Sequence, residues 1–147
     1  MKPANTIKIE MLNLSENEAL ARNIAAVFTA PLDPTVEELT EIKTAVSEAV
    51  SNAILHAYDK GEEGWIYMKM ESSETGRIII IVEDKGIGID DVKKAMEPLY
   101  TTVETGERSG MGFTVMESFM DRIIVDSSPG KGTKVTLIKS LDRINGL

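Results

Sequence analysis

Three polar side chains that could take part in catalysis or metal binding recur at intervals of four residues: Glu48, Asn52 and His56. Residues four apart lie one turn apart on the same face of a helix. A carboxylate beside an amide oxygen could act as a general base next to a ligand for a hard cation. Taken alone, the spacing favours a solvated polar stripe. A zinc site at His56 is not expected, because the chain has a single histidine and no cysteine.

The glycines form a second candidate set, since six of the 11 fall into three G-x-G pairs. The pairs are Gly86/Gly88, Gly110/Gly112 and Gly130/Gly132. Glycine lets backbone approach a ligand closely, and a G-x-G before a helix directs free amides at an anion. The second pair precedes a predicted helix over residues 113–120, and Arg108 could add a fixed positive charge there. Each pair alone is also explained as a tight turn.

Asp84 stands between an aliphatic run, residues 78–82, and the first glycine pair. The run predicts a buried strand, so the carboxylate would lie at the end of that strand beside flexible backbone. It could there accept a hydrogen bond from an exocyclic amine such as that of adenine. An Asx turn that ends the strand explains the same residue equally well.

Periodicity predicts the elements that must position these residues, in the order β-α-α-β-β-α-loop-α-β-β. Helices are expected from a capping box at Ser15 to Pro31, from Asp33-Pro34 to about Tyr58, and over residues 90–96 and 113–120. Leu20, Ile24, Val27 and Phe28 would form the apolar stripe of the first. The predicted strands cover residues 7–11, 65–70, 77–83, 122–126 and 134–138.

This order predicts an α+β fold, a two-layer sandwich with helices on one face of a mixed, mostly antiparallel sheet. No repeat or linker divides the sequence, so we expect one domain over residues 1–147.

Composition excludes several classes of function. The chain carries 16 Lys+Arg against 24 Asp+Glu, a formal net charge of −8, and has no basic cluster that would suit a nucleic acid. Its longest aliphatic run is far shorter than the roughly 20 residues of a membrane span. The N-terminus lacks the apolar core of a signal peptide, and the absence of cysteine fits a reducing compartment. We therefore expect a soluble, cytoplasmic protein that binds neither nucleic acid nor membrane.

Four motifs occur together in one order: Glu48-Ala-Val-Ser-Asn52-Ala, Asp84-Lys-Gly86-Ile-Gly88, Gly110-Met-Gly112 and Gly132-Thr133. The combination resembles the N, G1 and G2 boxes and the final Gly-Thr of the GHKL superfamily, which comprises gyrase, Hsp90, histidine kinases and MutL. Its ATP-binding α/β sandwich is called the Bergerat fold. Within the superfamily, the chain is most similar to the bacterial anti-sigma factor serine kinases, and among these to the sporulation branch that acts on sigma F. Stretches such as Glu107-Arg-Ser-Gly-Met-Gly-Phe-Thr114 carry this similarity.

The resemblance implies a role for each motif. Glu48 would be the general base for the attacking hydroxyl, and Asn52 would hold Mg²⁺. Asp84 would accept from the adenine amino group, with Thr133 assisting at the same base. Arg108, in a lid of about residues 97–109, would neutralise charge on the γ-phosphate. The residues assigned to ATP and its product ADP are Asn52, Asp84, Gly86, Gly88, Thr101, Thr102, Arg108, Ser109, Gly110, Met111, Gly112 and Thr133.

The resemblance also implies partners. Such a protein would inhibit a sporulation sigma factor and phosphorylate a serine of its anti-anti-sigma antagonist, and proteins of this kind are typically dimers. Arg22 is the candidate partner contact, although an ordinary exposed arginine explains it as well. The equivalent kinase of the general stress response and an ATPase module like those of gyrase or MutL are the alternatives. A histidine kinase domain is disfavoured, because such domains commonly carry Asn at the position of Glu48.

Overall fold

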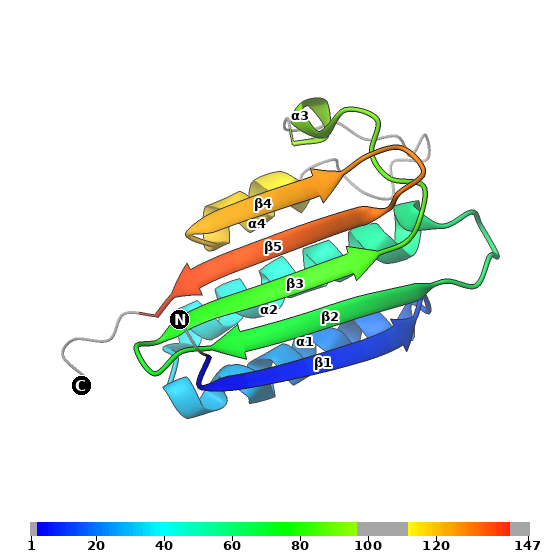
Figure 1. The fold of residues 1–147 in the computed structure, drawn as a ribbon. Coiled ribbons are helices and arrows are strands. Elements are labelled where there is room, and N and C mark those ends of the chain that lie inside the picture. Colours follow the sequence, from blue (N-terminus) through cyan, green and yellow to red (C-terminus); the bar gives the residue numbers. More distant parts are fainter. Residues whose placement is uncertain (1–2, 97–111, 142–147) are drawn as a thin grey trace.

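The computed structural model describes residues 3–96 and 112–141, which form a five-stranded sheet with helices on one face (Figure 1). The strands lie in the order β1-β2-β3-β5-β4. Their bounds are Asn5–Leu12 for β1, Trp65–Ser72 for β2, Arg77–Asp84 for β3, Arg122–Ser127 for β4 and Thr133–Ser140 for β5. The expected α+β sandwich is confirmed. Every neighbouring pair of these strands is antiparallel, so the sheet is not mixed as the sequence predicted.

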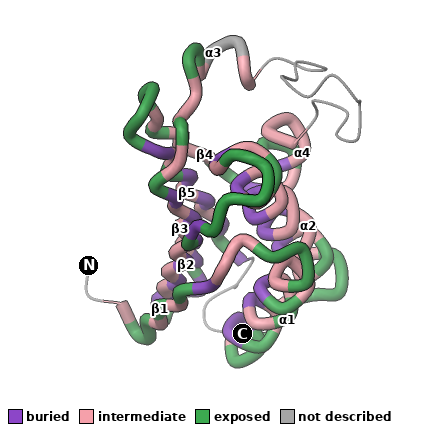
Figure 2. Tube along the Cα trace, turned by 90° about the vertical axis from the view of Figure 1, so that its right-hand side faces the viewer, coloured by how far each residue is buried: buried purple, intermediate pink, exposed green. Residues whose placement is uncertain are grey.

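In the described part of the chain, the second layer consists of α1 (Glu16–Thr29), α2 (Val36–Asn52) and α4 (Gly112–Phe119). Seen along the layers, the sheet and the helices stand side by side with buried residues between them (Figure 2). A 3₁₀ turn, Ala30–Leu32, separates α1 from α2, and a π-helical turn, Ala53–Ala57, extends α2. The short α3, Val92–Ala95, lies outside the two layers (Figure 1).

The core follows from strict alternation in the two neighbouring strands β2 and β3. Every second side chain of these strands points at the helices, and the apolar ones among them are at most 2% exposed. Burying each such side chain contributes about 1.5–3 kcal/mol to folding. The core members from the two strands are Ile66, Met68, Met70, Ile78, Ile80 and Val82.

The start of α2 differs from the prediction by two residues. Asp33 has a φ of 54° and ends the 3₁₀ turn in the left-handed region, so it does not cap the next helix. Thr35 is the N-cap: its side chain accepts from the Glu38 amide, and the Glu38 side chain accepts from the Thr35 amide. This reciprocal pair satisfies two amides that the first turn leaves without helical partners.

The start of α1 also differs. Ser15 is its N-cap residue, but the Ser15 side chain makes no capping hydrogen bond, so the expected capping box is wrong. The buried face of α1 is formed by Ala21, Ala25 and Phe28, not by the predicted stripe as a whole. Leu20 is 53% and Val27 74% exposed, because the face that α1 packs against its neighbours runs through Ala21, Ala25 and Phe28 and leaves these two side chains outside it.

Strand register places several predicted site residues at one end of the sheet. Asp84, the last residue of β3, is opposite Thr133, the first residue of β5. α2 ends and α4 begins near the same place, as the contacts of Gly112 with α2 side chains show. No helix among the described residues is long and apolar enough to cross a bilayer.

Candidate functional site

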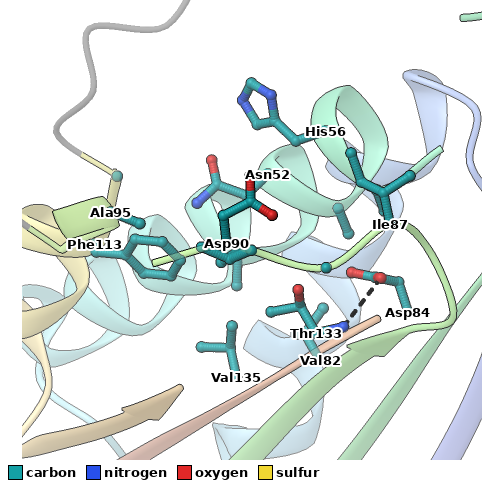
Figure 3. A pocket seen from close by; sticks show the side chains of 16 residues that line it. Asn52, His56, Val82, Asp84, Ile87, Asp90, Ala95, Phe113, Thr133 and Val135 are labelled. Carbon is teal, nitrogen blue, oxygen red and sulfur yellow. Dashed lines mark hydrogen bonds between the residues drawn. The ribbon is translucent and has the colours of Figure 1, made fainter. Parts of the chain in front are cut away.

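A cavity of about 310 Å³ opens at this end of the sheet, between the end of α2 and the loop that follows β3 (Figure 3). Its polar lining includes Asn52, Asp84 and Thr133, and its apolar walls include Ile87 and Phe113. Most ligand pockets combine apolar walls with a few convergent polar groups in this way. The cavity therefore brings together residues from all four sequence motifs, of which Gly112 represents the third.

Asp84 lines the cavity and is only 5% exposed. Its Oδ1 accepts hydrogen bonds from the backbone amides of Gly86, at 2.9 Å, and Thr133, at 3.2 Å. Burial raises the pKa of this carboxyl, and the two amide hydrogen bonds oppose the shift. The hydrogen bond from Gly86 forms the Asx turn that the sequence offered as an alternative explanation of Asp84. No hydrogen bond from the described residues reaches Oδ2, so that oxygen can accept from a ligand.

Two glycines fix the loop after Asp84. Gly86 packs directly on the carbonyl group of Ala57, and the next amide, of Ile87, donates to the same carbonyl oxygen at 2.7 Å. Gly88 has a φ of 77° and packs on the carbonyl oxygen of Ser128. A Cβ at either position would overlap these backbone atoms. The structure therefore gives both glycines a packing role. Of the two, only Gly88 lines the cavity. A close approach of either glycine to a nucleotide stays a prediction.

Glu48 and Asn52 meet the start of α4. A Cβ at Gly112 would lie 3.0 Å from Asn52 Nδ2 and 3.3 Å from Glu48 Oε2. The absence of a side chain at this first helical residue therefore leaves room for both α2 side chains beside the helix N-terminus, where backbone amides favour anions. The carboxylate and amide oxygens are hard donors of the kind that Mg²⁺ prefers, so their chemistry fits this ion.

Thr133 is held by a residue that the sequence did not single out. Ser127, its partner in the β4–β5 register, lies with Oγ 2.8 Å from Thr133 Oγ1. Ser127 Oγ also accepts from the Ile89 amide at 2.8 Å and donates to the carbonyl of Gly132 at 2.9 Å. Only the cross-strand pairing reveals this role, since the sequence shows an ordinary serine before a turn.

Tyr58 is a second residue that sequence reasoning missed. Its hydroxyl donates to the carbonyl of Trp65 at 2.6 Å and accepts from the amide of Lys85 at 3.0 Å. The ring also packs against Gly64, which leaves no space for a Cβ there. Tyr58 thereby ties the end of the π-helical turn to the residue after Asp84.

The remaining predicted residues fall into two groups. Arg22 lies on α1, which packs behind β1 and β2 (Figure 1), and it does not line the cavity. Its Nη1 is 3.2 Å from Glu18 Oε2, and its side chain is 37% exposed. The predicted lid over residues 97–109 lies outside the described residues, as do Thr101, Thr102, Arg108, Ser109, Gly110 and Met111.

Comparison with known proteins agrees with this geometry. A profile of the histidine kinase-like ATPase domain matches residues 12–139. Anti-sigma F factors of Clostridium beijerinckii and Clostridium novyi are 51% and 53% identical to the chain over 141 and 140 residues. These matches cover 96% and 95% of the chain, and 98% and 97% of the relatives. The chain belongs to the anti-sigma F factor family. A Bacillus licheniformis member is 48% identical over 143 residues.

Solved structures confirm the fold of this family. The RsbU and RsbW domains of a Mycobacterium tuberculosis protein match with a TM-score of 0.70 at 20% identity, over 97% of this chain and 34% of that one. Membership of the histidine kinase-like ATPase family implies an ATP site. The cavity at Asp84 is the candidate for that site, because residues of the four sequence motifs line it. Anti-sigma F family membership further supports kinase or ATPase activity.

Proposed function

We propose that this chain is a cytoplasmic anti-sigma factor that binds and inhibits sigma F and phosphorylates a serine of its anti-anti-sigma antagonist with ATP. The observation that carries the kinase half is the cavity, which is lined by the buried acceptor Asp84 and by Asn52. Glu48 adjoins it, since its carboxylate lies beside Asn52 at the start of α4. The names of the Clostridium and Bacillus relatives support the anti-sigma half.

The base end of the cavity suits adenine. Asp84 Oδ2 accepts a hydrogen bond from the 6-amino group, while Oδ1 keeps its hydrogen bonds from the backbone amides of Gly86 and Thr133. Val82, Ile87 and Val135 supply apolar surface on which a purine ring can lie. A buried, backbone-anchored carboxylate is a poor partner for a carbonyl oxygen, so the site rejects purines that carry oxygen in place of the amine.

The phosphate end suits phosphoryl transfer, which depends on positioning and charge stabilisation more than on covalent chemistry. The first amides of α4 point at the phosphates. The oxygen of the serine hydroxyl forms a bond to the γ-phosphorus, and Glu48 takes the proton that this hydroxyl loses. The bond from that phosphorus to the β–γ bridging oxygen breaks, and ADP leaves with the electron pair.

A magnesium ion belongs to this proposal as well. Asn52 would hold it, and when bound the ion neutralises charge on the phosphate oxygens. Gly110 and Met111 would extend the amide donors of Gly112, and Arg108 would add a positive charge at the γ-phosphate. Thr101, Thr102 and Ser109 complete the proposed nucleotide contacts.

The proposed partners engage a different surface. Arg22 on α1 is the proposed contact, and it forms an ion pair with Glu18 one turn earlier on the helix. A second copy of the chain is proposed to form a homodimer.

Transcription in vitro tests the inhibition of sigma F and the phosphorylation of the antagonist together. The protein should abolish transcription by RNA polymerase carrying sigma F, and unmodified antagonist should restore it. Antagonist first incubated with the protein and MgATP should no longer restore it, whereas incubation with a Glu48→Ala variant should leave the antagonist active. Inhibition of a stress-response sigma factor alone would assign the chain to that alternative. No inhibition of either, with ATP hydrolysis retained, would favour an ATPase module.

A further inference from the structure

The hydrogen-bond network behind Thr133 decides which way the Thr133 hydroxyl can act. Ser127 Oγ lies within hydrogen-bond distance of three groups: the Ile89 amide at 2.8 Å, the Gly132 carbonyl at 2.9 Å and Thr133 Oγ1 at 2.8 Å. A serine hydroxyl has one proton to give and two lone pairs with which to accept. The positions of the three partners therefore leave few arrangements of the protons.

Two of the three partners have a fixed role. The Ile89 amide can only donate, so it occupies one lone pair of Ser127 Oγ. The Gly132 carbonyl can only accept, so it takes the single proton of Ser127. The second lone pair of Ser127 is then left for Thr133, whose hydroxyl must donate to it. The opposite orientation would place two oxygen lone pairs against each other at 2.9 Å.

Thr133 consequently presents only lone pairs to the cavity. Its side chain lines the cavity beside Asp84, as Figure 3 shows, and its own amide holds Asp84 Oδ1. Asp84 Oδ2 is likewise an acceptor. This part of the cavity therefore carries two neighbouring acceptors. An exocyclic amino group has two N–H protons with which to match them, whereas a 6-oxopurine has one, on N1, beside a carbonyl oxygen that cannot donate.

We infer that Ser127 is a specificity-determining residue that, without touching the base, fixes the Thr133 hydroxyl as an acceptor and so makes the cavity select a 6-aminopurine over a 6-oxopurine. This inference rests on the proposed nucleotide site and adds to it the origin of base selection. Without Ser127, the Thr133 hydroxyl rotates freely and can donate to the carbonyl oxygen of a 6-oxopurine. The preference of the cavity for the 6-aminopurine therefore decreases.

The test compares equilibrium binding of ADP and inosine diphosphate, which carries an oxygen in place of the amino group and a proton on N1, by isothermal titration calorimetry. The wild type should prefer ADP. Ser127→Ala should narrow the ratio of the two dissociation constants by about 5- to 10-fold, the effect of about one hydrogen bond. Thr133→Val removes the hydroxyl itself, so adding Ser127→Ala to Thr133→Val should leave the ratio unchanged. Should Ser127→Ala fail to fold, Ser127→Cys keeps the shape with a weak hydrogen-bonding group and should narrow the ratio in the same direction.

A role limited to packing the loop would weaken both nucleotides equally. An unchanged ratio in Ser127→Ala, or in Ser127→Cys where that variant is used, therefore overturns the inference while leaving the proposed function intact. A further change of the ratio in the double variant overturns it too, because Ser127 would then act by a route other than Thr133. A wild type that binds neither nucleotide overturns the proposed function and this inference together.

Discussion

Asp84 and Thr133 face each other across the β3–β5 pair, and the Thr133 amide donates to Asp84 Oδ1 at 3.2 Å. This contact joins two motifs that lie 49 residues apart in the sequence. It also fixes the carboxylate plane, because the Gly86 amide donates to the same oxygen. The other oxygen, Oδ2, is thereby held in one position before any ligand arrives, which lowers the entropy lost on binding.

Replacing Asp84 separates its binding role from its structural one. Asp84→Asn keeps an oxygen that can accept from the Gly86 and Thr133 amides, but it removes the charge from a buried position. We expect ADP affinity to fall by about 10-fold or more, since a hydrogen bond to a charged group contributes about 1.5–3 kcal/mol. The melting temperature without nucleotide should hold or rise, because a desolvated charge is lost. Calorimetric titration measures the ADP affinity, and thermal unfolding measures the melting temperature. An unchanged ADP affinity would contradict the proposal that Asp84 binds the adenine amino group.

The raised pKa of Asp84 predicts a pH dependence with a defined sign. Because the folded-state pKa lies above the unfolded one, this group's contribution to stability is fully present below the unfolded pKa and is lost as pH rises through the folded pKa. Nucleotide binding should show the opposite trend, since only the ionised carboxylate offers both oxygens as acceptors. ADP affinity should therefore weaken on acidification before ordinary aspartates titrate. Asp84→Asn should flatten this dependence, and a wild-type profile identical to that of the variant would refute the explanation.

Two glycines with nearly the same backbone give a matched pair. Gly88 and Gly130 have φ values of 77° and 78°, but a Cβ at Gly88 would overlap the Ser128 carbonyl, whereas a Cβ at Gly130 meets nothing within 4 Å. Both alanine variants bear the left-handed strain of about 1–2 kcal/mol. Gly88→Ala should in addition displace the loop that lines the cavity and lose nucleotide binding. Gly130→Ala should bind nucleotide as the wild type does. Calorimetric titration measures the affinity of each variant, and denaturant unfolding measures its stability. An equal loss of nucleotide affinity in the two variants would show that backbone strain alone, and not the overlap at Ser128, causes the loss.

Gly112 tests the phosphate end of the cavity. Alanine there would place Cβ 3.0 Å from Asn52 Nδ2 and 3.3 Å from Glu48 Oε2, closer than most side-chain contacts. The fold should tolerate the change, because alanine favours helix over glycine by up to about 1 kcal/mol. Phosphotransfer should nevertheless fall by about 10-fold or more, since small misplacements of catalytic groups are costly. Ser118→Ala, on the exposed side of α4, is the control and should retain full activity. Full activity in Gly112→Ala would contradict the proposed place of Glu48 and Asn52.

Much of this architecture could be predicted because it is local. The aliphatic run at residues 78–82 predicts β3, and the four-residue spacing of Glu48 and Asn52 places them on one helix face. Single capping residues were less predictable. Both Asp33 and Thr35 are good N-cap types, and only the left-handed backbone of Asp33 decides between them.

Long-range contacts account for the residues that the sequence did not reveal. Ser127 and Tyr58 act through partners that strand register and the π-helical turn bring close, and neither belongs to a motif. Leu20 and Val27 fit an apolar stripe by spacing, yet they are exposed, because spacing does not specify how far around a helix its neighbours reach.

The fate of the γ-phosphate of ATP tests the central claim most directly. The protein would be incubated with its antagonist and MgATP labelled at the γ-phosphate, beside a Glu48→Ala variant. The account predicts acid-stable phosphoserine on the antagonist with the wild type. It predicts none with Glu48→Ala, although that variant should still bind ADP. Label released only as free phosphate, or equal labelling of the antagonist by both proteins, would contradict the account.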